Sequence, residues 1–320
     1  MGVLSVDLVG KIGDQLFILE KESPKKTAVT YMLVAQILFS IMFAMIGFLR
    51  EEYTTLQILY FRNLYSFIFN TSFCNGKNLE IYVPDGKALK LLILRGALGA
   101  SAMILMFASF EYMNLSDCVV INNLSPIWTN VMAIFFLGEK YQKKAVVCFG
   151  LGFSGVIFMS RPSFLFGDVN SQEKINENNN QLLGSILAFL GSVSVAYMTI
   201  ILKKLTTMFK CHNAVQQQYT YIITIFSTAL LLLIYGQASF DVLNKHFLAL
   251  GFCLSFIGWI AQLLFSRSFS IEDTSLIAPI SYVNTFITFL VDIYIFNSHI
   301  EITSIIGSVL IILGSLGVIL

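Results

Sequence analysis

Long apolar segments alternate with short polar ones along almost the whole chain. A helix that crosses a bilayer needs about 20 mostly apolar residues, and reading from charge to charge gives ten such segments. They lie near residues 28–49, 53–73, 91–110, 116–137, 145–160, 182–202, 214–236, 247–266, 274–296 and 302–320. The pattern predicts an all-α integral membrane protein with ten transmembrane helices.

The composition agrees with a lipid environment. Of the 320 residues, 56% are hydrophobic and 12% are charged, whereas a soluble domain has about 25% charged residues. A net charge of +1 without a long basic run gives no support for nucleic-acid binding. The five cysteines are scattered and form no CxxC pair, so neither a metal site nor a disulfide framework is predicted. The sequence contains no cofactor motif.

The lysines and arginines of the loops are divided unevenly between the two sides of the predicted membrane. Ten spans place both termini on one side, and that side carries 14 lysines and arginines against four on the other. Cytoplasmic loops are enriched in these residues, so both termini are predicted to be cytoplasmic. Residues 1–26 carry charges throughout and are predicted to be a cytoplasmic tail. The plasma membrane and an endomembrane both remain open as locations.

The two halves of the chain come into partial register when Ser116 is placed on Ser275, which also places Gly155 on Gly314. We call this displacement along the chain the repeat offset. Five is an odd number of spans, so the second half enters the membrane from the opposite side. Many secondary transporters are built from such inverted repeats and bind substrate between them. The sequence thus predicts two inverted five-helix repeats at 27–166 and 182–320, joined by a polar linker at 167–181.

Polar side chains surround a proline in the middle of the fourth span. Pro126 lacks a backbone donor and leaves a carbonyl free at membrane depth. Such groups are tolerated where they are buried in protein or line a cavity that contains water. Helical spacing places Asn122 and Ser125 on one side of the span, with Pro126 beside them. These three residues are predicted to contact a substrate, unless the amides serve only to join neighbouring helices.

The segment 94–141, together with Arg161-Pro162, resembles the EamA-type repeat of the drug/metabolite transporter superfamily. It is most similar to the G branch of the human solute carrier 35 group. The matching elements are Leu94-Arg95-Gly96, the turn from Asn114 to Asp117, Ser125-Pro126, and the run from Phe136 to Glu139. The second half departs from the family pattern, because Thr285 and Ser298 stand where a proline and a glutamate are usual.

The resemblance implies a transporter with ten helices, cytoplasmic ends and a central pathway between two five-helix units. Its substrate would be a small polar metabolite, such as an organic anion. The expected partners are then a small-molecule substrate and the lipid bilayer. Whether the protein forms a homodimer remains open. A membrane sensor or scaffold on a transporter-like fold is the main alternative. A channel is less favoured, because the sequence has no filter motif.

Charged residues within the spans are the strongest candidates for a functional role. An arginine at a helix centre costs about 2.5–3.5 kcal/mol on insertion scales, so Arg62 either lies beside the substrate pathway or reaches toward the outer interface. Arg95 is predicted to be an interfacial anchor. Asp292 is a candidate for a coupling proton, for pairing with Arg62, or for a position near the surface. The predicted polar lining is completed by Tyr197, Gln262, Tyr282 and Asn284.

One short motif raises the alternative of an intramembrane enzyme. Gly152-Phe153-Ser154-Gly155 matches the GxSG pattern of rhomboid proteases. A catalytic serine needs a base within hydrogen-bond reach, and all three histidines fall in loops or at span edges. Glycines at this spacing are also typical of closely packed helices. The sequence therefore predicts that the protein is not an enzyme and that it has no catalytic residues.

Overall fold

The computed structural model describes most of the chain between Glu20 and Ile319. The described residues are Glu20, 22–49, 52–83, 85–109, 112, 115–140, 143–160, 165, 181–236, 244–296 and 302–319. Most of the predicted tail at 1–26, nearly all of the linker at 167–181, and the Arg161-Pro162 motif lie outside them. The elements are α2 (Pro24–Leu49), α3 (Thr55–Gly76), α4 (Gly86–Ser109), α5 (Leu115–Asn122), α6 (Ser125–Leu137), α7 (Lys143–Ser160), α9 (Gln181–Met208), α10 (Asn213–Ile234), α11 (Lys245–Ile271), α12 (Thr274–Ile277), the 3-10 helix η2 (Ala278–Tyr282), α13 (Val283–Phe296) and α14 (Ile302–Ile319).

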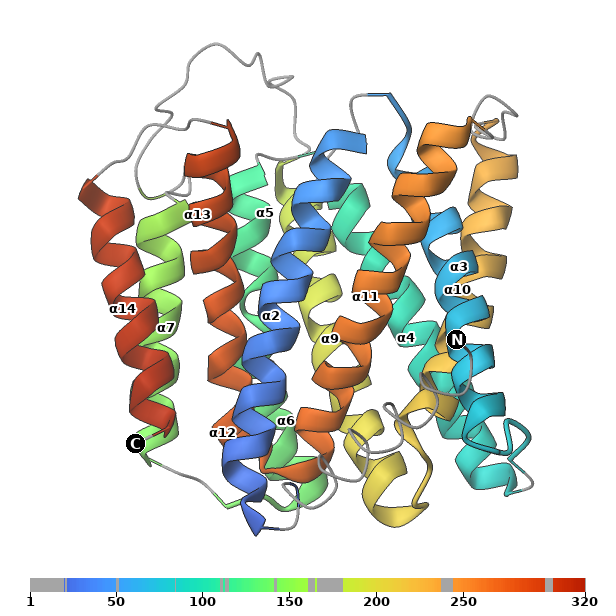
Figure 1. Ribbon diagram of the computed structural model, residues 1–320. Coiled ribbons are helices and arrows are strands. Elements are labelled where there is room, and N and C mark those ends of the chain that lie inside the picture. The colour runs from blue at the N-terminus through green and yellow to red at the C-terminus, as the bar shows by residue number, and fades with distance from the viewer. Residues whose placement is uncertain are drawn as a thin grey trace, which may run out of the picture.

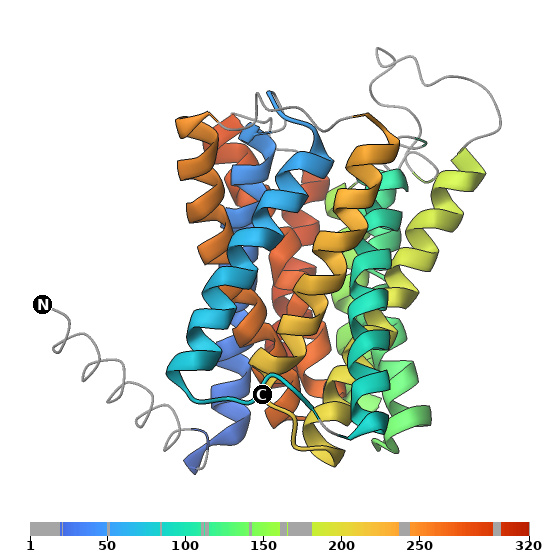
Figure 2. The same cartoon turned by 90° about the vertical axis from the view of Figure 1, so that its right-hand side faces the viewer.

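The helices form one bundle in which most of them run along a common direction (Figures 1 and 2). The described part of the chain is helical and contains no strand. Seven helices in it are long and apolar enough to cross a membrane, and two shorter apolar helices cover Thr274–Leu290 and Ile302–Gly317. We call the end at which α2 begins and α14 ends the lower end, as drawn in Figure 1. The fold is that of an all-α, multi-pass membrane protein.

The fourth and ninth predicted spans are each divided into shorter helices. α5 ends at Asn122 and α6 begins at Ser125, with Pro126 in its first turn. In the other half, α12 continues into η2, where Pro279 occupies the first turn, and then into α13. A proline lacks the backbone donor of a helix interior but is accepted in the first turn. Pro126 therefore starts a new helix, whereas the apolar pattern predicts one continuous span through this residue.

Several helices extend further than the apolar segments that predict them, and α4, α9 and α11 do so by the most residues. α4 begins at Gly86, α9 continues to Met208 and α11 continues to Ile271. The sequence ended these spans at charges, but a lysine or arginine near a helix end can extend its charged group along the helix. Lys203 and Arg267 thus lie within regular helix.

The outer surface of the bundle is apolar, as a bilayer requires. Large side chains such as Phe43, Phe135, Phe226, Leu233 and Leu316 are exposed. Polar residues, by contrast, are buried inside the bundle. A soluble protein shows the opposite distribution, so the exposed surface supports a membrane location.

α7 and α14 pack against each other through glycines. A Cβ atom added at Gly155 would lie 2.6 Å from the carbonyl oxygen of Gly307 and 2.7 Å from a carbon of Ile311. The Gly152 backbone lies against the ring of Tyr282 in the same way. The GxSG motif is therefore a helix-packing motif, as glycines at membrane-helix interfaces commonly are.

We expect Gly155→Ala to lower the thermal unfolding midpoint of the detergent-purified protein. The added methyl group overpacks the α7–α14 contact, and such changes cost about 1–3 kcal/mol. Gly150→Ala is the matched control in the same helix, because a Cβ atom there meets nothing within 4 Å. Equal midpoints for the two variants would contradict the packing role of Gly155.

Candidate functional site

Arg62 is buried in the upper half of the bundle, where α3 meets α10 and α11. It is 8% exposed, and its Nε atom has no hydrogen-bond partner among the described residues. The guanidinium packs against Gly258 of α11, which has no side chain. A Cβ atom added at Gly258 would lie 3.6 Å from Arg62 Nε. Tyr221 of α10 interacts with it electrostatically. Burial excludes the predicted alternative in which Arg62 reaches the interface.

Arg95 of α4 is fully buried, which corrects the prediction of an interfacial anchor. Its Nη1 donates to the carbonyl oxygen of Gln216 at 3.0 Å and to Thr220 Oγ1 at 2.6 Å. Both acceptors belong to α10, and Tyr221 on the same helix also interacts with this guanidinium. α10 covers α4 and thereby removes Arg95 from the interface, which the position of Arg95 along its own span did not reveal.

α10 carries a buried polar stripe that the sequence prediction missed. Thr220, Thr224 and Thr228 follow each other at intervals of four residues, and Tyr221 lies beside them. Lower on the helix, Gln216 and Gln217 are also buried. Polar residues that recur every four positions in an apolar span lie on one face of the helix. The stretch AVQQQYTYIITIFST shows this spacing, so the polar face of α10 could have been predicted from the sequence.

The residues predicted around Pro126 lie at the break between α5 and α6. Asn122 Nδ2 donates to the carbonyl oxygen of Cys118 at 3.1 Å. A Cβ atom added at Gly191 of α9 would lie 3.7 Å from Asn122 Oδ1. Ser125 is half-buried and Pro126 is buried. The structure thus brings these three residues together at the break, and Asn122 faces α9.

The polar residues of the second half lie against other helices. Tyr282 is fully buried in η2, and its hydroxyl has no hydrogen-bond partner among the described residues. Asn284 Oδ1 accepts a hydrogen bond of 2.6 Å from Ser40 of α2. The side chain of Asp292, which belongs to α13, lies outside the described residues.

The two remaining predicted residues lie on α9 and α11. The Tyr197 ring contacts Phe136 of α6 at 5.8 Å between centroids. Gln262 is half-buried, one turn beyond Gly258, and therefore on the side of α11 that faces Arg62. The contacts of the predicted residues fall around α9, around α2, and between α3 and α11.

A buried ion pair joins three helix ends at the lower end of the bundle. Lys203 Nζ of α9 lies 2.5 Å from Glu139 Oε1, and their side chains are 11% and 7% exposed. Glu139 also accepts hydrogen bonds from the backbone N–H and the hydroxyl of Thr274, at 2.9 and 3.0 Å. Gly138 ends α6 with φ of +68°, a conformation that glycine adopts readily, and directs Glu139 inward. We call Glu139, Lys203 and Thr274 the lower latch.

A pocket of about 330 Å³ opens beside α4 and α10 at the same end. Charged residues at its wall include Glu80, Asp85 and Lys210, and Ala88 and Val215 form part of its apolar lining. The wall also includes Cys211 and His212. Burial raises the pKa of the Cys211 thiol to about 11. Burial, and then the charges of Arg267 and Lys77, lower the pKa of His212, which favours the neutral ring that accepts the Ala214 N–H.

Comparison with known proteins identifies relatives across most of the chain. A stretch of 216 residues is 28% identical to solute carrier family 35 member G1 of Homo sapiens, covering 67% of this chain and 58% of that protein. The chain thus spans less than two thirds of the length of this relative. An S-adenosylmethionine uptake transporter of Rickettsia prowazekii is 25% identical over 227 residues, covering 71% of this chain and 70% of that protein.

The fold also matches a solved structure. A protein of known crystal structure superposes with a TM-score of 0.72 at 12% identity, covering 91% of this chain and 97% of the other. The model of the EamA-like transporter family matches twice, at residues 26–161 and 182–320. Members of this family are transporters rather than enzymes, in agreement with the sequence prediction. The chain therefore belongs to the EamA-like transporter family.

Proposed function

We propose that the protein is a secondary transporter that moves a small polar metabolite, an organic anion, across the membrane by alternating access. The observation that carries this proposal is the burial of Arg62 inside the bundle without a hydrogen-bond partner for its Nε. A buried charge is costly unless it is paired, and an anionic substrate supplies the missing partner. A relative named as an S-adenosylmethionine uptake transporter supports a small metabolite as the transported solute.

The helix boundaries support two inverted repeats, at 27–166 and 182–320. When the repeat offset is added to the first and last residue numbers of α7, the result is the first and last residues of α14. In the same way, the first residues of α4 and α5 correspond to those of α11 and α12. α2 packs against α11, and α4 packs against α9. These two contacts are equivalent, because the repeat relates α2 to α9 and α4 to α11. α2 and α9 run in opposite directions through the bundle (Figure 1).

Arg62 and Tyr221 occupy equivalent positions in the two proposed repeats. The repeat offset places one on the other, and they interact across the boundary between α3 and α10. Transporters of this kind bind substrate near the midplane where the repeats meet. We therefore place the substrate at Arg62, with Gln262 beside it. Asn122, Ser125, Pro126, Tyr197, Tyr282 and Asn284 complete the pathway at the broken helices.

The lower latch is the contact that alternating access has to break. Glu139 belongs to the first proposed repeat, whereas Lys203 and Thr274 belong to the second. The repeat offset relates these three positions to Ser298, Ala44 and Leu115, which carry no charge. The sequence thus provides the latch at one end only. By the distribution of lysines and arginines, we assign this end to the cytoplasm, together with both termini.

Purified protein in sealed vesicles tests the proposal against a sensor or scaffold function. We expect saturable uptake of an organic anion that is accelerated by the same solute inside the vesicle. An imposed pH gradient tests whether Asp292 carries a coupling proton, because Asp292→Asn would then remove the response to pH. Absence of saturable flux for every solute of a broad metabolite panel would contradict a transporter and support the alternative.

A further inference from the structure

Arg95 has one edge of its guanidinium group without a partner. Nη1 is held by Gln216 and Thr220 of α10, which fixes the orientation of the group. Nε and Nη2 are buried and have no hydrogen-bond partner among the described residues. These two nitrogens form the edge with which an arginine binds a carboxylate or phosphate through two parallel hydrogen bonds. Arg95 is therefore oriented as an anion receptor.

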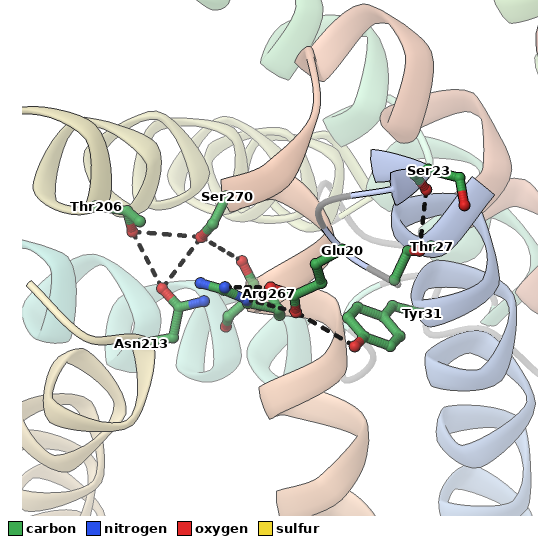
Figure 3. Close-up of polar contacts among 9 residues, drawn as sticks. Glu20, Ser23, Thr27, Tyr31, Thr206, Asn213, Arg267 and Ser270 are labelled. Carbon is green, nitrogen blue, oxygen red and sulfur yellow. Dashed lines mark hydrogen bonds and ion pairs between the residues drawn. The ribbon is translucent and has the colours of Figure 1, made fainter. Parts of the chain in front are cut away.

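Arg267 of the same chain illustrates how this edge is used. Its Nε and Nη2 donate to the two carboxylate oxygens of Glu20, at 3.0 and 2.5 Å (Figure 3). The hydroxyl of Tyr31 donates to the same carboxylate at 3.2 Å. The Arg267 side chain is 41% exposed, whereas Arg95 is fully buried. Since charge burial is the larger cost, Arg95 has the greater need of an anionic partner.

Both buried arginines lie close to one tyrosine of α10. Tyr221 interacts electrostatically with both Arg62 and Arg95. Among the described residues, the ion pairs join Lys203 to Glu139 and Asp273, and Arg267 to Glu20. In this part of the chain neither Arg62 nor Arg95 has a carboxylate partner. A substrate with a single negative charge would leave one of the two guanidiniums uncompensated.

The pocket at the lower end lies on the same side of α4 as Arg95. Ala88, which lines it, is seven residues before Arg95 and thus two helical turns closer to that end. Across the pocket, Val215 precedes the Gln216 carbonyl that holds Arg95. The pocket therefore lies between α4 and α10, about two helical turns below Arg95.

We propose that Arg95 is a second anion-binding residue of the pathway and that the substrate is a small molecule with two negative charges. One anionic group binds the Nε–Nη2 edge of Arg95 and the other faces Arg62. Carboxylate and phosphoryl groups both match this edge. The inference rests on the proposed transport function and narrows its substrate class.

Uptake into vesicles of purified protein tests the charge requirement. Succinate and glycerol 3-phosphate serve as dianionic probes, and succinamate is a monoanion of nearly the same size as succinate. We expect wild-type uptake of at least one dianion to exceed that of succinamate about tenfold or more, as one lost ion pair implies. Arg95→Gln is expected to abolish this preference, whereas the control Arg267→Gln retains it. Saturable uptake of succinamate that neither succinate nor glycerol 3-phosphate exceeds would overturn the dianion inference and leave transport itself intact.

Thermal unfolding of the detergent-purified protein tests Arg95 independently of flux. We expect a dianionic probe to raise the wild-type midpoint and succinamate to leave it unchanged. Arg95→Met should keep a midpoint at least equal to that of the ligand-free wild type and lose the response to the dianion. Arg267→Met, which leaves Glu20 unpaired, should lower the midpoint. A loss of stability in Arg95→Met as large as in Arg267→Met, or a wild type that responds to no probe, would overturn the proposal.

Discussion

Replacing Arg62 with alanine is expected to reduce anion uptake about 10- to 100-fold while the protein remains in the membrane. The reason is that hydrogen bonds to a charged group contribute about 1.5–3 kcal/mol to the binding free energy. Within the described structure Arg62 makes no ion pair, so substrate binding does not have to break one. The measurement is initial uptake in vesicles that contain equal amounts of folded protein. Arg62→Lys should recover part of the rate, because it keeps the charge and loses the planar fork.

Lys144→Ala is the matched control for a lost positive charge. Lys144 is exposed in the first turn of α7, remote in sequence from the buried arginines. We expect uptake close to that of the wild type. Normal uptake by Arg62→Ala at equal protein content would remove Arg62 from the substrate site, whatever the behaviour of the control.

Breaking the lower latch is the second change with a large expected effect. Glu139→Gln leaves the buried Lys203 ammonium with only the more distant carboxylate of Asp273, at 3.8 Å. Removing one partner of a buried ion pair costs up to about 3–5 kcal/mol. The closed lower end should therefore lose stability. In a protein whose native cysteines have been replaced, a cysteine at the buried Ser275 of α12 reports this opening. We expect it to react faster with a membrane-impermeant thiol reagent applied from the lower side.

The double variant Glu139→Gln/Lys203→Met separates a gate from a general loss of folding. It removes both charges, so we expect a smaller drop in the unfolding midpoint than for Glu139→Gln alone. Reactivity at position 275 should remain high, because no ion pair closes the end. Unchanged reactivity in both variants would show that the latch does not control access from this side.

Much of the fold follows from the sequence because a bilayer limits how a chain can cross it. Backbone groups have no water to bind in lipid, so apolar segments of sufficient length become helices. The apolar pattern thus located the helices of the bundle, and the structure shows a proline at each of the two broken spans, Pro126 and Pro279. Boundaries were less accurate at α4, α9 and α11, because lysines and arginines near the interface do not stop a helix.

The candidate site could be predicted only in part. Arg62 was found because a charge within an apolar segment is conspicuous whatever surrounds it. Arg95 was placed wrongly, since its burial depends on α10, a helix that lies far away in the chain. Lys203 was counted only as a loop charge, although it pairs with Glu139.

By itself, the sequence determined that this is an all-α membrane protein of the EamA type, since both features are written in local patterns of apolar residues and short motifs. Only the tertiary structure decided which polar groups are buried and which have partners. Burial and pairing are properties of helix contacts between distant segments, so no local pattern encodes them. The unpartnered edge of Arg95 and the closed lower latch exist only because α10 covers α4 and because α9 and α12 meet the end of α6.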